Sequence, residues 1–271
     1  MLQRGLQAGV KVDLLISVKS DSLMHLHPQI DSLQGVSNAL SERGFCLVSA
    51  PLLARMAQLD LQDLMALGTY WNALQPDHFL KDQGRYRLRR HDSLIVSAGQ
   101  AQKVPHRAHW QSLDYNALHG GIERLFEPID EGLSGSPVWQ QLIQGVASSW
   151  DVGQTPRKWY TEAHQFRINT VDGIGRPTPE GAHRDGVDYV AVILVARENI
   201  KGGETRIFEL SGNEGLRFTL EEPWSMLLLD DHRIVHETTP IQSDGGLGHR
   251  DTLVLTFRLG GFQEPQLKTA P

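Results

Sequence analysis

Two histidines and one aspartate in the second half of the chain have the types and spacing of a metal site. They are His183, Asp185 and His236. Two imidazoles and one carboxylate are the protein ligands of the iron(II) facial triad, which leaves coordination positions open for reactants. On a strand, His183 and Asp185 would project from the same face, because side chains alternate with a period of two. His236 would come from a distant strand folded back beside them. The pattern therefore predicts an iron site with redox chemistry.

The His-x-Asp tripeptide is weak evidence by itself. With 12 histidines in 271 residues, chance alone gives roughly one such tripeptide. A second one, His249-Arg250-Asp251, is present, but no histidine follows it to complete a triad. His232 and His236 both follow the first tripeptide. His232 comes directly after two aspartates in an expected turn, whereas His236 lies in an expected strand, so His236 is the preferred third ligand.

Composition places the chain among ordinary globular proteins. The apolar fraction is 40% and the charged fraction is 21%, as in typical soluble domains. A formal net charge of -6 gives no reason to expect a nucleic-acid partner. No apolar run is long enough to span a membrane. The single cysteine, Cys46, excludes an internal disulfide and favours a cytoplasmic location. Because Cys46 lies in an apolar run, we expect a buried, inert thiol.

The elements that would position the triad differ between the two halves of the chain. Residues 1–30 show no sustained hydrophobic periodicity and are expected to form an irregular arm. Residues 31–150 are expected to be mostly helical, with helices from 31 to 43, 51 to 75 and 118 to 150 and a buried strand at 45–48. Arg85, Arg87 and Arg89 alternate as on one face of a strand. Gly44 supplies a helix stop.

After residue 160, short apolar runs alternate with Gly, Pro, Asn and Asp turns. Seven or more short strands at even spacing are typical of an antiparallel sandwich or jelly roll. The expected strands are 164–170, 189–196, 205–210, 216–220, 225–229, 234–238 and 252–259. We therefore predict a single α+β domain over residues 1–271, in which N-terminal helices pack against a β core at 160–260.

Several motifs resemble the 2-oxoglutarate/iron(II) dioxygenases. They are His183-Arg184-Asp185-Gly186, Gly202-Gly203-Glu204, His236-Glu237-Thr238-Thr239-Pro240-Ile241 and Arg250-Asp251-Thr252. Within that superfamily the chain is most similar to the bacterial L-isoleucine hydroxylase-like group with its biofilm- and stress-associated relatives. Matching upstream motifs, such as Gly84-Arg85-Tyr86-Arg87 and His164-Gln165-Phe166-Arg167, extend the resemblance over roughly residues 40–260.

The resemblance implies a double-stranded β-helix (jelly-roll) core with Fe(II) at one open end and 2-oxoglutarate and O₂ as cosubstrates. It also implies a cosubstrate arginine on the last core strand. Arg250, with Thr252 two residues later, is the expected anchor of the distal carboxylate, because a guanidinium fork suits a carboxylate. Arg258 has the same strand parity and is the alternative anchor.

The implied substrate is a small molecule, in particular a free L-amino acid with a hydrophobic side chain such as isoleucine, leucine or methionine. Arg87, Gln165 and Arg167 are the candidate groups for binding its carboxylate. Gln165, Arg167 and Asn169 share strand parity and could line one wall. The alternative is that each of these side chains has only a structural role.

Two other functions remain open at the level of sequence. A cupin-type metalloenzyme without an oxo-acid cosubstrate would not need Arg250. A jelly-roll binding or stress-related protein could keep a metal-like site without catalysis. A protein kinase is excluded, because neither His-Arg-Asp string is followed by the asparagine that kinases carry five residues after the aspartate. The sequence leaves the oligomeric state open.

Overall fold

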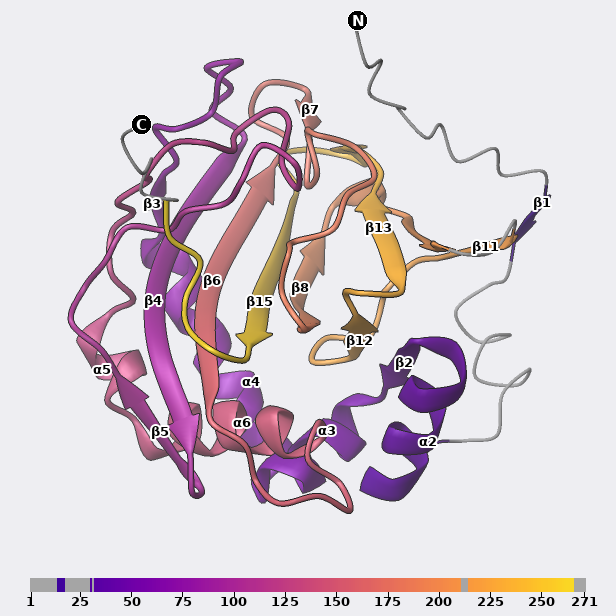
Figure 1. The fold of residues 1–271 in the computed structure, drawn as a ribbon. Coiled ribbons are helices and arrows are strands. Elements are labelled where there is room, and N and C mark those ends of the chain that lie inside the picture. Colours follow the sequence, from indigo (N-terminus) through magenta and orange to yellow (C-terminus); the bar gives the residue numbers. More distant parts are fainter. Residues whose placement is uncertain (1–13, 18–29, 31, 211–213, 266–271) are drawn as a thin grey trace, which may run out of the picture.

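Two curved β-sheets face each other in the computed structural model, which describes residues 14–17, 30, 32–210 and 214–265 (Figure 1). In this part of the chain the larger sheet has the strand order β2-β12-β8-β15-β6-β4-β3, with β5 paired to β4. The smaller sheet has the order β1-β11-β10-β13, and a three-stranded sheet has the order β7-β14-β9. This mixed helix and sheet arrangement confirms the predicted jelly-roll core.

The strands have the following bounds: β1 Leu14–Ser17, β2 Phe45–Val48, β3 Gln75–Pro76, β4 Arg87–Ser97, β5 Gln100–Lys103, β6 Trp159–Asn169, β7 Ile174–Gly175, β8 Tyr189–Glu198, β9 Ile200–Gly202, β10 Thr205–Glu209, β11 Glu214–Phe218, β12 Met226–Asp230, β13 Ile234–Thr238, β14 Ile241–Ser243 and β15 His249–Arg258. The helices are α2 Leu33–Arg43, α3 Ala50–Ala57, α4 Leu61–Leu67, the 3₁₀ helix η1 Gly68–Ala73, α5 Glu131–Ser134 and α6 Pro137–Ser148. Every strand expected after residue 160 has a counterpart.

The N-terminal half contains less helix than the sequence predicts. The expected helix at 51–75 is divided, because Gln58 adopts a left-handed conformation (φ 56°) that ends α3. The expected helix at 118–150 starts only at α5. Before it, Gly121 has a φ of 76°, and a side chain at Gly120 would collide with the Ser112 carbonyl oxygen at 2.5 Å. Arg87 and Arg89, whose alternation suggested a strand, lie in β4, which has eleven residues. Most of the expected irregular arm lies outside the described residues.

Helix ends follow the capping residues in the sequence. The Ser32 side chain accepts a hydrogen bond from the Gly35 backbone N–H, and Gly44, with a φ of 77°, closes α2. Ser49 caps α3 and Ser136 caps α6, each followed by a proline in the first turn. Such caps satisfy backbone N–H groups that have no partner inside the helix. Among the described residues, no helix is long and apolar enough to cross a membrane.

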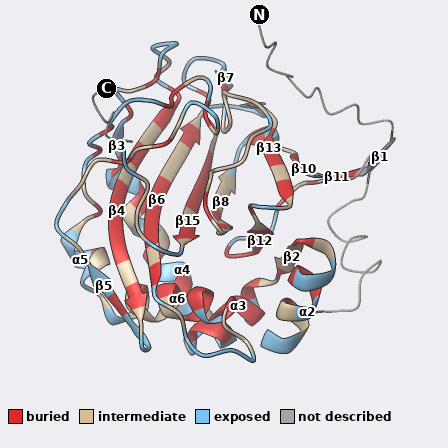
Figure 2. Cartoon of the chain, in the orientation of Figure 1, coloured by how far each residue is buried: buried red, intermediate tan, exposed pale blue. Residues whose placement is uncertain are grey.

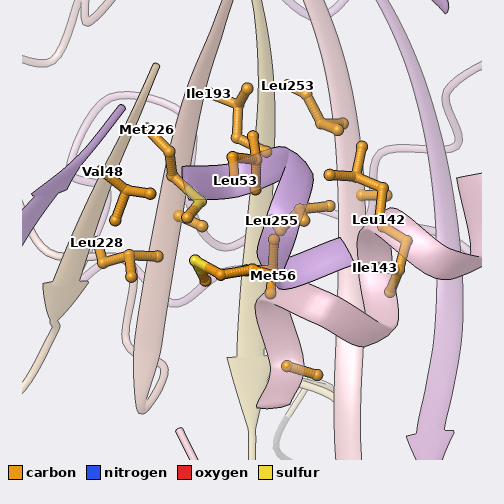
Figure 3. Close-up of a cluster of buried hydrophobic side chains, with 14 of the residues drawn as sticks. Val48, Leu53, Met56, Leu142, Ile143, Ile193, Met226, Leu228, Leu253 and Leu255 are labelled. Atoms are coloured by element: carbon orange, nitrogen blue, oxygen red, sulfur yellow. The ribbon is translucent and has the colours of Figure 1, made fainter. Parts of the chain in front are cut away.

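The main core lies between the helices and the outer face of the large sheet. Leu53 and Met56 of α3 and Leu142 of α6 pack against Ile193 of β8 and Leu253 of β15 (Figure 3). A second core, which includes Val190, Leu227 and Ile234, fills part of the space between the two sheets. Strands of the large sheet are therefore buried on both faces, as Figure 2 shows for β4, β6 and β15.

Alternation along each long strand assigns its residues to the two faces. On β15, Leu253, Leu255 and Phe257 contribute to the helix-side core. Arg250 and Thr252 project instead into the space between the sheets, where they line a cavity. The inner face thus presents polar side chains to the cavity, while the helices pack against the outer face.

Cys46 is a core residue of β2. Burial raises the pKa of its thiol to about 12. At neutral pH the thiol is therefore protonated, which agrees with the inert role predicted for it.

Candidate active site

His183, Asp185 and His236 converge at one end of the space between the two sheets. Their ligand atoms lie within 4.8 Å of one another. His183 Nε2 is 3.8 Å from Asp185 Oδ1, and His236 Nε2 is 3.8 Å from Asp185 Oδ2. One carboxylate and two imidazole nitrogens therefore face a common point, as a facial triad requires.

The backbone brings these residues together in a different way from the one predicted. His183 and Asp185 belong to the loop before β8, whereas the sequence suggested a strand. His183 and His236 form an isolated antiparallel bridge, with reciprocal N–H to carbonyl hydrogen bonds of 3.0 Å. This bridge and two hydrogen bonds between the Thr178 hydroxyl and the Thr238 backbone tie the loop to β13. The chain then turns so that the Asp185 carboxylate points back to both rings.

The turn after the triad depends on Asp231 and a glycine. The Asp231 carboxylate accepts hydrogen bonds from the backbone N–H groups of Asp185, Gly186 and Val187, at 3.0, 2.8 and 3.1 Å. Burial and the nearby Asp185 charge raise the pKa of Asp231 to about 6. Gly186 has a φ of 76°, and a Cβ there would lie 2.4 Å from the Tyr115 ring. Only glycine fits this turn.

The ring nitrogens of the two histidines are arranged for metal binding. His183 Nδ1 donates to the Gly181 carbonyl oxygen at 2.9 Å, so the Nε2 lone pair is left for a metal. Burial and the neighbouring His183 hold the pKa of His236 well below its usual range, which keeps its ring neutral. Burial also lowers the pKa of His183, but the Asp185 and Glu180 carboxylates outweigh it and the pKa is raised. The donor set fits Fe(II).

Arg250 lines the same cavity from β15. Its side chain is buried, and its Nε and Nη2 atoms have no hydrogen-bond partner within the described part of the chain. Burial and the Arg197 cation lower its pKa to about 10. An unpaired buried cation is costly unless an anion completes it. Thr252 lines the cavity beside Arg250. This arrangement fits the distal carboxylate of a dicarboxylate cosubstrate.

Arg258 occupies the other end of β15 and is engaged elsewhere. Its Nη1 donates to the carbonyl oxygens of Gly261 and Phe262, both at 3.0 Å. Arg258 has the strand parity of Arg250, as predicted, but it is not among the described residues that line the cavity. The geometry therefore favours Arg250 as the carboxylate anchor.

The candidate substrate residues fall on two different faces. Arg87 of β4 lines the cavity and forms an ion pair with Asp77, with Nε 2.7 Å from Oδ2, which leaves its Nη2 without a partner among the described residues. Gln165 and Arg167 of β6 lie on the helix side of the sheet, opposite to what we expected. Arg167 binds the Asp251 carboxylate at 2.7 Å and the Asn72 side chain at 3.1 Å. Neither residue reaches the cavity.

Sequence reasoning missed the residues on the cavity side of β6. Glu162, His164 and Phe166 line the cavity, with the parity opposite to Gln165. Arg124 and His109, from the segment between β5 and α5, join them. A signal was available, because Glu162 and His164 alternate with the uncharged Thr161 and Ala163. The polar sequence Gln165-Phe166-Arg167 that follows obscured which parity faces inward.

Residues 68–256 match a protein family described as 2OG-Fe dioxygenase. The chain belongs to the 2OG-Fe dioxygenase family. Membership implies Fe(II), 2-oxoglutarate and O₂, and so confirms the predicted cofactors and the dioxygenase activity at family level. The observed triad supplies the residues that would hold the iron.

Three solved structures are similar to this chain. A BsmA homologue from Methylobium petroleophilum PM1 is 46% identical, with a TM-score of 0.81 over 86% of this chain and 96% of that one. IDO from Bacillus thuringiensis is 19% identical, with a TM-score of 0.69 over 86% and 100% of the two chains. The Fe(II)/α-ketoglutarate-dependent dioxygenase TqaL is 17% identical, with a TM-score of 0.64 over 86% and 90%. The last two show the shared fold. A comparison with curated proteins found no match.

Proposed function

We propose that this 2OG-Fe dioxygenase hydroxylates a free L-amino acid and releases succinate and CO₂, as a member of the group related to the L-isoleucine hydroxylase. One observation carries the proposal. The His183–Asp185–His236 triad and the unpaired Arg250 guanidinium line one cavity of about 130 Å³.

The residues of the chain have separable tasks in this proposal. The triad would hold Fe(II), which when bound supplies the oxidative chemistry on O₂ and the 2-oxo acid. Arg250 and Thr252 would grip the distal carboxylate of 2-oxoglutarate and so fix its position. Apolar cavity residues, among them Val187, Val192 and Val254, would exclude water and contact an apolar substrate side chain.

Arg250 separates this function from a cupin-type metalloenzyme. A metal site that needs no oxo acid has no use for a buried guanidinium whose Nε and Nη2 lack partners in the described structure. Two further basic groups that line the cavity, Arg87 and Arg124, support a substrate that carries a carboxylate.

The test is a mass-spectrometric screen of the twenty L-amino acids with the iron-loaded protein, 2-oxoglutarate, ascorbate and O₂. We expect one or a few amino acids with apolar side chains to gain one oxygen atom, with an equal amount of succinate formed. Failure of every amino acid, together with retained succinate formation, would contradict the amino-acid assignment. Absence of both products would favour a non-catalytic binding protein.

A further inference from the structure

His109 and Arg124 form a paired donor and acceptor at the wall of the cavity. They lie opposite each other in an isolated antiparallel bridge, with His109 N–H to Arg124 carbonyl and Arg124 N–H to His109 carbonyl hydrogen bonds of 3.0 and 2.9 Å. Side chains of directly opposed residues leave the backbone on the same side, with Cβ atoms about 5 Å apart. Both side chains line the cavity that holds the metal triad.

The His109 ring offers a lone pair to the cavity. Its Nδ1 donates to Glu162 Oε2 at 2.9 Å, and no described group donates to its Nε2. Burial lowers the pKa of His109 to about 4, so the ring is neutral near pH 7. Burial opposes ionisation of Glu162, but the bonds from His109 and His91 hold its pKa well below the usual range. A carboxylate behind a neutral imidazole is an arrangement that accepts a hydrogen bond from a cation.

The Arg124 guanidinium offers donors. It is 2% exposed, and its Nε and Nη2 have no partner within the described residues. Burial and the Arg87 cation lower its pKa. A planar fork of N–H groups in this state is suited to a carboxylate.

A second metal centre is the main alternative for this region, because ligand atoms of His91, His109, Glu162 and His164 lie within 4.8 Å of one another. Two features oppose it. Arg89 Nη2 donates to His164 Nδ1 at 2.8 Å, so that lone pair is taken. The rings of His91 and His164 are stacked, with centroids 4.7 Å apart and planes at 22°, so their in-plane lone pairs do not converge.

We infer that His109, supported by Glu162, binds the ammonium group of a free α-amino acid, and that Arg124 binds its carboxylate. The acceptor and the donor fork are adjacent, as the two charged groups of an α-amino acid are. This inference rests on the proposed function, since the triad in the same cavity supplies the chemistry. It names Arg124, His109 and Glu162 as specificity determinants in place of Gln165 and Arg167.

The test uses calorimetric binding to the full chain loaded with Mn²⁺ and 2-oxoglutarate under argon, so that no turnover occurs. The twenty L-amino acids are titrated, and the tightest binder is then compared with its deaminated carboxylic acid and with its α-amide. We expect each analogue to bind about 10- to 100-fold more weakly, as the loss of one charged hydrogen-bonded group requires. Equal affinity for the amino acid and either analogue would overturn the inference without any variant.

Two variants identify which side chain binds the carboxylate and which binds the ammonium group. Arg124→Gln should weaken amino-acid binding by about 10- to 100-fold and remove discrimination against the amide. Glu162→Gln should remove discrimination against the deaminated acid. Arg85→Gln, which alters an arginine whose side chain is 76% exposed, is the matched control and should bind like the unaltered protein. If a variant fails to fold, Arg124→Lys, which keeps the charge but loses the fork, replaces Arg124→Gln.

The same titrations distinguish failure of this inference from failure of the proposed function. If the unaltered protein does not bind 2-oxoglutarate, the proposed function itself is contradicted. Normal 2-oxoglutarate binding with unchanged discrimination in both Arg124→Gln and Glu162→Gln would overturn this inference alone. Zinc titration of the metal-free chain decides the alternative. A second tight equivalent that disappears in His91→Gln would replace amino-acid recognition by a metal centre.

Discussion

At the scale of single residues, the site combines two imidazoles and a carboxylate that can hold a metal with a buried, unpaired cation. His183 is held by the Gly181 carbonyl so that its Nε2 faces Asp185. Arg250 is buried without partners for its Nε and Nη2 among the described residues. The free energy that this desolvation costs is recovered only when an anion binds. The chain is thus prepared at two separate points, one for a metal and one for a carboxylate.

Arg250→Gln should weaken 2-oxoglutarate binding by about 10- to 100-fold, because a charge-assisted hydrogen bond contributes roughly 1.5–3 kcal/mol. The measurement is calorimetric titration of 2-oxoglutarate into the Mn²⁺-loaded protein. Arg258→Gln is the matched control, because Arg258 binds carbonyl groups at the other end of β15, and its dissociation constant should be unchanged. A larger effect at Arg258 than at Arg250 would reverse the assignment.

The ionisation of His109 has a consequence for stability. Its pKa is lowered by burial to about 4 in the folded chain, below the usual histidine value near 6.5. As pH falls from 6.5 towards 4, the unfolded state therefore takes up the proton first and the folded state loses stability. The difference in unfolding free energy between the unaltered protein and His109→Gln should shift by about 1.4 kcal/mol per pH unit in that window. Urea unfolding at several pH values measures it, and a pH-independent difference would refute it.

At the scale of elements, the inner faces of the long strands hold the polar side chains that line the cavity. The parity of β15 could be predicted, since Arg250 and Thr252 belong to one motif and the apolar Leu253, Leu255 and Phe257 have the opposite parity. That of β6 was predicted wrongly, because Gln165 and Arg167 are as polar as Glu162 and His164, and only the packed helices decide which set is covered. The loop position of His183 and Asp185 was equally beyond prediction. It depends on contacts with β13, far along the chain, which include the backbone bridge to His236 and the hydrogen bonds of Thr178 to Thr238.

Gly186→Ala should damage the metal site through its turn. The left-handed backbone (φ 76°) and the 2.4 Å approach to Tyr115 together should cost at least about 1–3 kcal/mol and displace Asp185. Gly173→Ala is the control, since Gly173 also has a positive φ (85°) but no atom within 4 Å of the added Cβ. We expect Gly186→Ala alone to lose Mn²⁺ affinity. Equal metal affinities in both variants would show that the turn does not position Asp185.

Arg167→Gln tests the facing of β6. Arg167 pairs with Asp251 on the helix side of the sheet, so its loss should lower the melting temperature and leave the KM for the amino acid within about twofold. The melting temperature and steady-state kinetics on the same preparation decide the matter. A tenfold rise in KM at an unchanged melting temperature would place Arg167 in the substrate site after all.

At the scale of the whole molecule, the two faces of the large sheet have different roles, one in stability and one in chemistry. The helices, including α3 and α6, cover the outer face of the large sheet and build the main core. The inner face can therefore hold buried charges such as Arg87, Glu162 and Arg250 without being the main source of stability. The jelly-roll class was predictable from strand spacing and turns. The broken helices of the N-terminal half were not, because left-handed residues such as Gln58 carry no distinctive sequence signal.

The most direct test of the whole account is succinate formation from 2-oxoglutarate by the Fe(II)-loaded protein and by His183→Ala, in the presence of O₂ and the amino acid that binds best. We expect the unaltered protein to form succinate in step with the hydroxylated amino acid, and His183→Ala to form none above background. Undiminished succinate formation by His183→Ala, with the variant folded, would contradict the iron site on which the account depends.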